Sequence, residues 1–91
     1  MIREFEVIMI KIHHNRGLLV FARHLGPNHN FSVTEGSLFG DLPIYHDQNF
    51  QPKDKDDNPR HDIFVFRPTQ IERIFDRQFK EGQRVTLNIP D

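Results

Sequence analysis

The chain has no cysteine and no tryptophan. Without cysteine it can form no disulfide, no thiolate metal site and no cysteine nucleophile. A small domain that needs no disulfide fits a reducing compartment, so we expect a cytoplasmic protein. Long apolar runs are also missing. The most apolar stretch, residues 7–12, is interrupted by Lys11, and it falls far short of the roughly 20 residues of a spanning helix. We therefore expect a soluble protein with neither a membrane nor a secretory segment.

Neither sign of charge dominates. Lys and Arg number 12 and Asp and Glu number 13, which gives a formal net charge of −1. A protein that binds nucleic acid without regard to sequence gains its affinity from clustered basic residues that release counterions. The composition therefore argues against a general nucleic-acid binder, although it leaves a local basic patch open.

What the chain has in quantity is phenylalanine, with nine Phe among 91 residues. This length matches one domain. A Phe side chain buries a large apolar area and carries no polar atom that needs a partner. We therefore predict a single domain over residues 1–91 with a core rich in Phe.

The first segment, residues 3–14, has the composition of a long strand. Its apolar residues begin on one parity and finish on the other, in the order Phe5, Val7, Met9 and then Ile8, Ile10, Ile12. Because the side chains of a strand alternate between two faces, this shift predicts a bend or bulge at a barrel corner, or a strand covered on both faces. Residues 15–17, Asn-Arg-Gly, predict a tight hairpin turn.

Five further strands are expected, at residues 18–25, 31–34, 38–45, 63–66 and 84–89. The connections are too short for parallel crossovers, except where a helix precedes the last strand, so the pairing should be antiparallel. Closing the sheet buries both a core and the strand edges of so small a chain. The sequence therefore predicts a mainly β fold, a small antiparallel six-stranded barrel that is closed or partly open and has one short helix before the last strand.

Two segments depart from strand character. Residues 46–61 are polar, with Phe50 as their only strongly apolar member, and predict either a long mobile loop or an irregular excursion. Thr69 and Glu72 have the spacing of a helix capping box. The apolar residues that follow at helical spacing predict a helix over residues 69–78.

Four segments follow one another in a recognisable order: a long strand at 5–10, a polar turn and apolar strand at 16–21, a turn with glycine at 33–36, and a closing turn and strand at 79–87. This order resembles the second-domain β-barrel of translation elongation factors. The resemblance implies a barrel with a general binding role and supplies no catalytic residue. The Gly-x-x-x-x-Gly-Lys-Ser/Thr motif of the GTPase domain that accompanies this barrel is absent. An oligonucleotide-binding five-stranded barrel is the structural alternative.

The six histidines are the residues most able to carry chemistry. The pairs His46-Asp47 and His61-Asp62 bracket the polar loop, so a loop that closes on itself would bring two imidazoles and two carboxylates together. Such a set could bind zinc or another divalent ion, and a small metal-dependent protein or enzyme is one hypothesis. The alternative is that these residues are solvated strand ends, because their spacing matches no established zinc signature.

The first hairpin offers a second candidate surface, formed by His13, Arg16, Phe21 and Arg23. Barrel faces that carry Arg and aromatic residues can stack the bases of single-stranded nucleic acid. The alternative is that Phe21 belongs to the core and the basic residues lie at the solvent-exposed rim of the barrel. In this hairpin, a turn at 15–17 places His24 opposite residues 7–9 and away from His13.

No catalytic constellation stands out, since the two serines, Ser32 and Ser37, lie outside any Gly-x-Ser-x-Gly setting. We therefore predict a non-catalytic binding module without a cofactor that contacts a protein or ribonucleoprotein partner. The strands at 5–12 and 18–22 are apolar on both faces, which predicts a second buried face. The helix or a second copy of the chain would cover it, so a homodimer is a further hypothesis.

Overall fold

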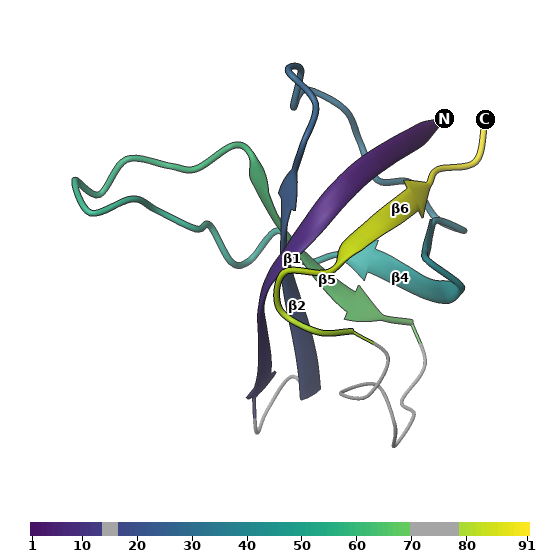
Figure 1. The fold of residues 1–91 in the computed structure, drawn as a ribbon, viewed down its shortest axis with the longest axis horizontal. Coiled ribbons are helices and arrows are strands. Elements are labelled where there is room, and N and C mark those ends of the chain that lie inside the picture. The colour runs from purple at the N-terminus through teal and green to yellow at the C-terminus, as the bar shows by residue number, and fades with distance from the viewer. Residues whose placement is uncertain (14–16, 70–78) are drawn as a thin grey trace.

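The computed structural model describes residues 1–13, 17–69 and 79–91. Across these residues the chain forms six strands: β1 (Ile2–His13), β2 (Gly17–His24), β3 (Leu38–Phe39), β4 (Leu42–His46), β5 (Ile63–Pro68) and β6 (Arg84–Asn88). All pairs are antiparallel, and the sheet closes into a barrel in the order β1-β2-β5-β4-β3-β6 (Figure 1). The predicted mainly β, six-stranded antiparallel barrel is confirmed in its closed form.

The helix expected over 69–78 lies, apart from Thr69, outside the described residues. The described part of the chain contains no helix, and so none that is long and apolar enough to span a membrane. Thr69 follows β5 and hydrogen-bonds to the neighbouring strand β4. Its amide donates to the Pro43 carbonyl at 3.0 Å, and its hydroxyl donates to the same oxygen at 3.5 Å.

A β-bulge sits in the middle of β1. Val7 pairs with Ala22 and Met9 pairs with Phe21, so Ile8 has no partner across the ladder. Phe5 and Val7 are buried in the core before the bulge, and Ile10 packs against the core after it. The predicted change of inward face is confirmed, and the extra residue explains it, because a bulge shifts the alternation by one position and bends the strand.

The register of the first hairpin differs from the expected one. β1 and β2 pair His13 with Gly17, a register different from the one that a turn centred on residues 15–17 would give, and the bulge shifts the pairing once more. As a result His24 lies opposite Phe5 and not opposite residues 7–9. The prediction that His24 lies far from His13 along the hairpin is confirmed.

The strand count of six is right, but two of its members differ from the prediction. Residues 31–34 form no strand; Phe31 and Val33 are partly buried against the core from outside the ladder, which is why their alternation imitates a strand. Residues 38–45 contain two strands, β3 and β4, separated by a tight turn. Gly40 occupies that turn with φ of +64°, a backbone conformation that glycine adopts without steric cost.

Phe5 lies at the centre of the core and is fully buried. Its ring centroid lies between 5.2 and 6.3 Å from the centroids of five other rings: His24, Phe31, Phe39, Phe64 and Phe66. Most of these contacts are edge-to-face, the geometry that aromatic quadrupoles favour. The predicted Phe-rich core is therefore confirmed, and it joins the first, second and fifth strands to the connection after β2.

The outer face of the sheet is also partly covered. Leu19 and Val65 are fully buried although their strand neighbours point into the core. Beside them, Phe21 of β2 meets Phe50 of the loop after β4 with ring centroids 6.5 Å apart. The loop therefore covers part of the second apolar face.

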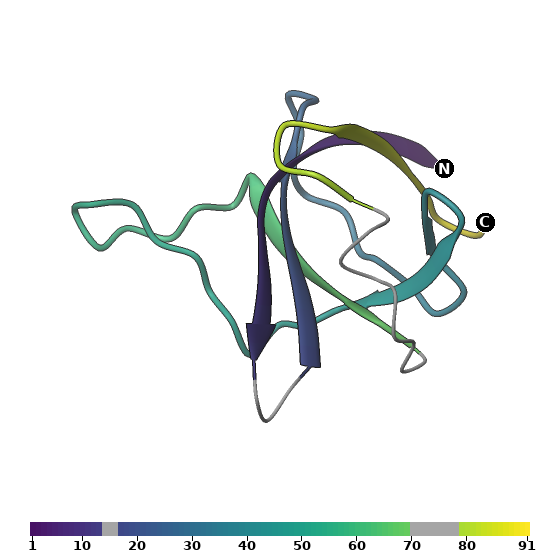
Figure 2. The ribbon, with the colours of Figure 1, turned by 60° about the horizontal axis from the view of Figure 1, so that its bottom comes forward.

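The loop between β4 and β5 projects from the barrel as a hairpin-like arm (Figures 1 and 2). Its two sides join at a bridge between Lys53 and Pro59. The Asp54 carboxylate caps the tip by accepting the amides of Asp56 at 2.9 Å and Asn58 at 3.0 Å. Of the two forms predicted for residues 46–61, the irregular excursion is the one observed.

Candidate ligand-binding pocket

A pocket of about 560 Å³ opens at the end of the barrel where β2 and β4 finish and β5 begins. Two connections border it: the start of the segment after β2, and both sides of the arm between β4 and β5. The lining residues are Pro27, Asn28, His29, Asn30, Phe31, His46, Phe50, Gln51, Pro52, Arg60, His61, Ile63 and Phe64. Its volume lies within the range of about 300–1,000 Å³ that is common for small-ligand sites.

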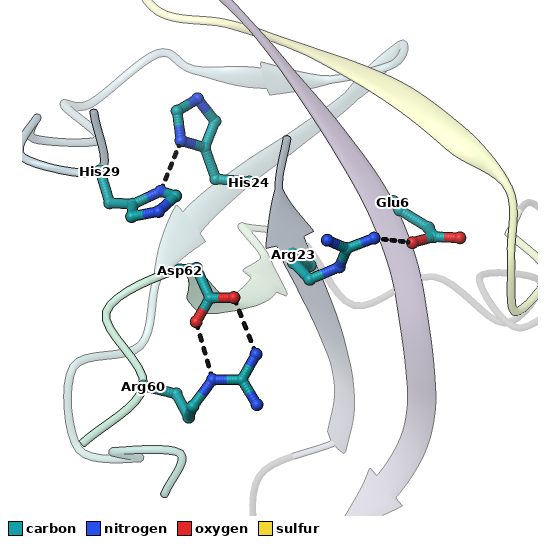
Figure 3. A network of polar contacts seen from close by, with 6 residues as sticks. All are labelled: Glu6, Arg23, His24, His29, Arg60 and Asp62. Carbon is teal, nitrogen blue, oxygen red and sulfur yellow. Dashed lines mark hydrogen bonds and ion pairs between the residues drawn. The ribbon is translucent and has the colours of Figure 1, made fainter. Parts of the chain in front are cut away.

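The connection after β2 is fixed by a contact between two histidines. Nδ1 of His24 and Nδ1 of His29 lie 2.9 Å apart (Figure 3). One of these nitrogens must donate the proton and the other must accept it, so at least one imidazole is neutral. His24 is 3% exposed, and burial, the charge of His29 and the charge of Arg3 all lower its pKa from 6.5.

Gly26 makes room for that contact. A Cβ at this position would lie 2.9 Å from Cε1 and 3.0 Å from Nε2 of the His24 ring, closer than real Cβ contacts come. The chain therefore turns tightly over the buried imidazole and carries His29 to the rim of the pocket. This turn is the reason why the two residues meet although five positions separate them in sequence.

The floor of the pocket is aromatic. The rings of Phe31 and Phe64 stack at a centroid distance of 5.0 Å with an interplanar angle of 14°. His46 packs on Phe64 at 5.0 Å, and the Arg3 guanidinium carbon lies 4.7 Å from the centroid of Phe31. Burial lowers the pKa of His46 below 6.5, against the smaller opposing charge of Asp47. Burial therefore favours the neutral imidazole of His46, which has one donor and one acceptor nitrogen.

Arg60 lies on the wall of the pocket and is held by Asp62. Its Nε and Nη2 donate to the two carboxylate oxygens of Asp62 at 2.9 and 2.8 Å (Figure 3). These hydrogen bonds raise the pKa of Arg60 and lower the pKa of Asp62. The carboxylate compensates the positive charge, and three N–H groups of the guanidinium take no part in this pair.

The four predicted metal ligands do not come together as a set. His46 and His61 line the same pocket. Asp47 is buried and accepts from the Asn49 amide at 3.0 Å and from Nη1 of Arg67 at 3.4 Å, while Asp62 is paired with Arg60. Among the described residues, no group of three or more His, Asp or Glu side chains is placed to hold a metal ion. The described part of the chain thus offers no preformed four-ligand site.

The predicted surface on the first hairpin is only partly described. Phe21 and Arg23 share the outer face of β2, where Phe21 contacts the loop and Nη2 of Arg23 lies 2.6 Å from Oε1 of Glu6 (Figure 3). His13 ends the first strand opposite Gly17, and Arg16 lies outside the described residues. Arg23 is therefore already paired with a carboxylate.

Sequence reasoning missed His24, His29 and Arg60 as parts of one site. The signal was the Gly26-Pro27 turn directly after His24, because a tight turn there returns the chain across the strand end. No feature of the sequence indicated the Arg60-Asp62 pair, because both residues lie in a loop whose conformation the sequence did not predict.

Comparisons of the chain with protein-family models, with curated proteins and with solved structures find no match. The likeness to a translation-factor barrel stays a prediction that rests on the segments at 5–10, 16–21, 33–36 and 79–87.

Proposed function

We propose that this chain is a non-catalytic binding module that holds a protein or ribonucleoprotein partner at the pocketed end of the barrel. One observation carries the proposal. Two connections, each fixed by its own polar contact, border a pocket of about 560 Å³ on a rigid aromatic floor. Loops that a rigid scaffold positions are where binding residues concentrate.

The chemistry of the lining supports binding over catalysis. The described lining residues include three histidines, His29, His46 and His61, but no Ser, Thr, Lys, Asp or Glu that could act with them as a nucleophile or a carboxylate base. Of the charged groups at the site, Arg60 is paired with Asp62. The lining therefore offers groups that can hold a partner, and no nucleophile among its described residues stands beside its histidines.

The resemblance to a translation-factor barrel supports a ribonucleoprotein partner and a cytoplasmic location. Self-association is a second candidate, because Ile8, Met9 and Ile12 expose 36%, 39% and 71% of their surface on the first strand. A molar mass of one chain at every concentration in light scattering would remove it.

A photo-crosslinking amino acid tests the proposed function. We would place it at Gln51, which lines the pocket, and as a control at Thr86, which is exposed on β6. In lysate of the source cells, we expect a discrete cross-linked species from position 51 that excess unlabelled protein competes away. Equal labelling from both positions, or no competable species from position 51, would contradict the proposal.

A further inference from the structure

The lining of the pocket combines aromatic rings with groups that donate and accept hydrogen bonds. Phe31, Phe50 and Phe64 supply the rings, and Asn28, Asn30 and Gln51 supply carboxamides. The imidazoles of His29, His46 and His61 add ring nitrogens that can donate or accept hydrogen bonds. A ligand in the pocket therefore meets aromatic surface and hydrogen-bonding groups side by side.

The charges of the lining disfavour two classes of ligand. No lining residue that the structure describes carries a carboxylate, so a cationic ligand finds no countercharge there. The described lining contains no Lys, its one guanidinium, that of Arg60, is compensated by Asp62, and the nearby Arg3 guanidinium lies over the ring of Phe31. Phosphate recognition relies on several uncompensated Lys or Arg residues, so a phosphate group is not the main determinant.

We propose that this pocket binds a planar nitrogen heterocycle, of the kind that a free nucleoside or an unpaired base of a single-stranded nucleic acid carries. The inference rests on the proposed function, because it names the group of the partner that the pocket holds. Such a ring packs its face against aromatic side chains and presents both donors and acceptors at its edge, and proteins read that edge with amide and guanidinium groups.

The polar groups are arranged for that edge. Oδ1 of Asn28 accepts the Asn30 amide at 2.9 Å, so the NH₂ group of Asn28 takes no part in this bond. Arg60 keeps three N–H groups outside its pair with Asp62. Asn28 stands on the connection after β2 and Arg60 on the arm between β4 and β5, so the lining carries donors on both of the connections that border the pocket.

Titration of the full chain with nucleosides tests this inference. Adenosine, guanosine, cytidine and uridine would be added in turn, followed by isothermal calorimetry and by ¹H–¹⁵N amide shifts. Ribose 5-phosphate and inorganic phosphate serve as ligands without a heterocycle. We expect at least one nucleoside to bind and to shift the amides of residues 28–31 and 60–64, and neither phosphate to do so.

Variants assign the binding to the pocket. Phe50→Ala should weaken nucleoside binding about fivefold or more, as loss of a stacking partner does, and the exposed Asn30→Ala should weaken it without touching the core. Tyr45→Ala is the matched aromatic control, because Tyr45 is exposed on β4 and lies outside the lining. Equal binding by all three variants and the wild type would overturn the inference.

Affinities measured for ligands of different length and at different salt concentrations distinguish a free nucleoside from a single-stranded nucleic acid. Affinity that is equal for a nucleoside and a single-stranded hexanucleotide identifies a free nucleoside, whereas tighter binding of the hexanucleotide identifies nucleic acid. In both cases the dependence on salt should be shallow. Ring recognition would be refuted if the affinity fell steeply with salt concentration and ribose 5-phosphate bound as tightly as a nucleotide. Competable cross-linking from Gln51 without nucleoside binding would refute this inference alone and leave the binding module in place.

Discussion

The two imidazoles of His24 and His29 share a single contact, with their Nδ1 atoms 2.9 Å apart and the His24 ring buried between Phe5 and Phe31. This contact joins the end of the second strand to the segment that borders the pocket. It tolerates one proton between the two nitrogens and not two. The order of the pocket is thereby tied to the protonation of one buried side chain.

Acid should therefore destabilise the fold before the carboxylates titrate. Burial lowers the pKa of His24 and of His46 below 6.5, so below pH 6.5 the unfolded chain takes up protons that the folded chain refuses, and stability rises with pH. We expect the free energy of unfolding in urea to fall from pH 7.5 to pH 5. The contribution of Asp62, whose pKa is lowered from 3.8, is lost only below about pH 4. A flat profile between pH 7.5 and 5 would contradict the assignment.

Gly26→Ala should destabilise the protein through His24. The new Cβ would meet the imidazole at 2.9 Å, and overpacking of this kind costs about 1–3 kcal/mol. In the background of His24→Ala the same substitution should cost much less, because the ring it strikes is gone. A double-mutant cycle in urea measures the coupling. Equal costs in both backgrounds would show that the two residues do not interact.

Phe5→Ala should remove about 3–5 kcal/mol of stability, the range for loss of a large buried aromatic ring. The ring contacts five others and has no exposed surface. Ile12→Ala is the control on the same strand, since Ile12 is 71% exposed and should change stability by about 0.5 kcal/mol or less. Comparable losses from both variants would mean that the centre of the core lies elsewhere.

Deletion of Ile8 should also destabilise the barrel, although it restores a regular alternation along β1. Ile8 is the unpaired residue of the bulge, and a bulge supplies the local bend that a closing sheet needs. A loss of about 1–3 kcal/mol is the usual size for a backbone change of this kind. Ile8→Ala keeps the bulge and is the control. If the deletion is no more costly than Ile8→Ala, the bend has no role in closure.

The sequence was most informative where hydrophobic parity was strict. The shift between Phe5-Val7 and Ile10 predicted either a bulge or a strand covered on both faces, of which the bulge is observed, and the strand expected at 84–89 is β6. It failed at Phe31 and Val33, whose period of two arises from packing onto the end of the barrel and not from a ladder. Local pattern cannot tell these two origins apart.

The candidate site was largely beyond prediction for a different reason. His46 and His61 were expected to approach each other if the polar loop closed on itself, with solvated strand ends as the alternative, and both line the same pocket. Their flanking carboxylates turn to other partners, Asp47 to Arg67 and Asp62 to Arg60. Which partner a charged side chain takes depends on the course of the loop, and no periodicity in residues 46–61 records that course.

The bridge between Lys53 and Pro59 has a practical consequence. The two sides of the arm are joined there, and residues 55–58 beyond it are all exposed, so the tip lies on the far side of the bridge from Gln51 and Pro52 of the lining. A fluorescent label on the side chain at position 55 would keep the Asp54 cap of the tip and stay outside the pocket. A label at the tip would therefore report on the conformation of the arm while a ligand binds in the pocket.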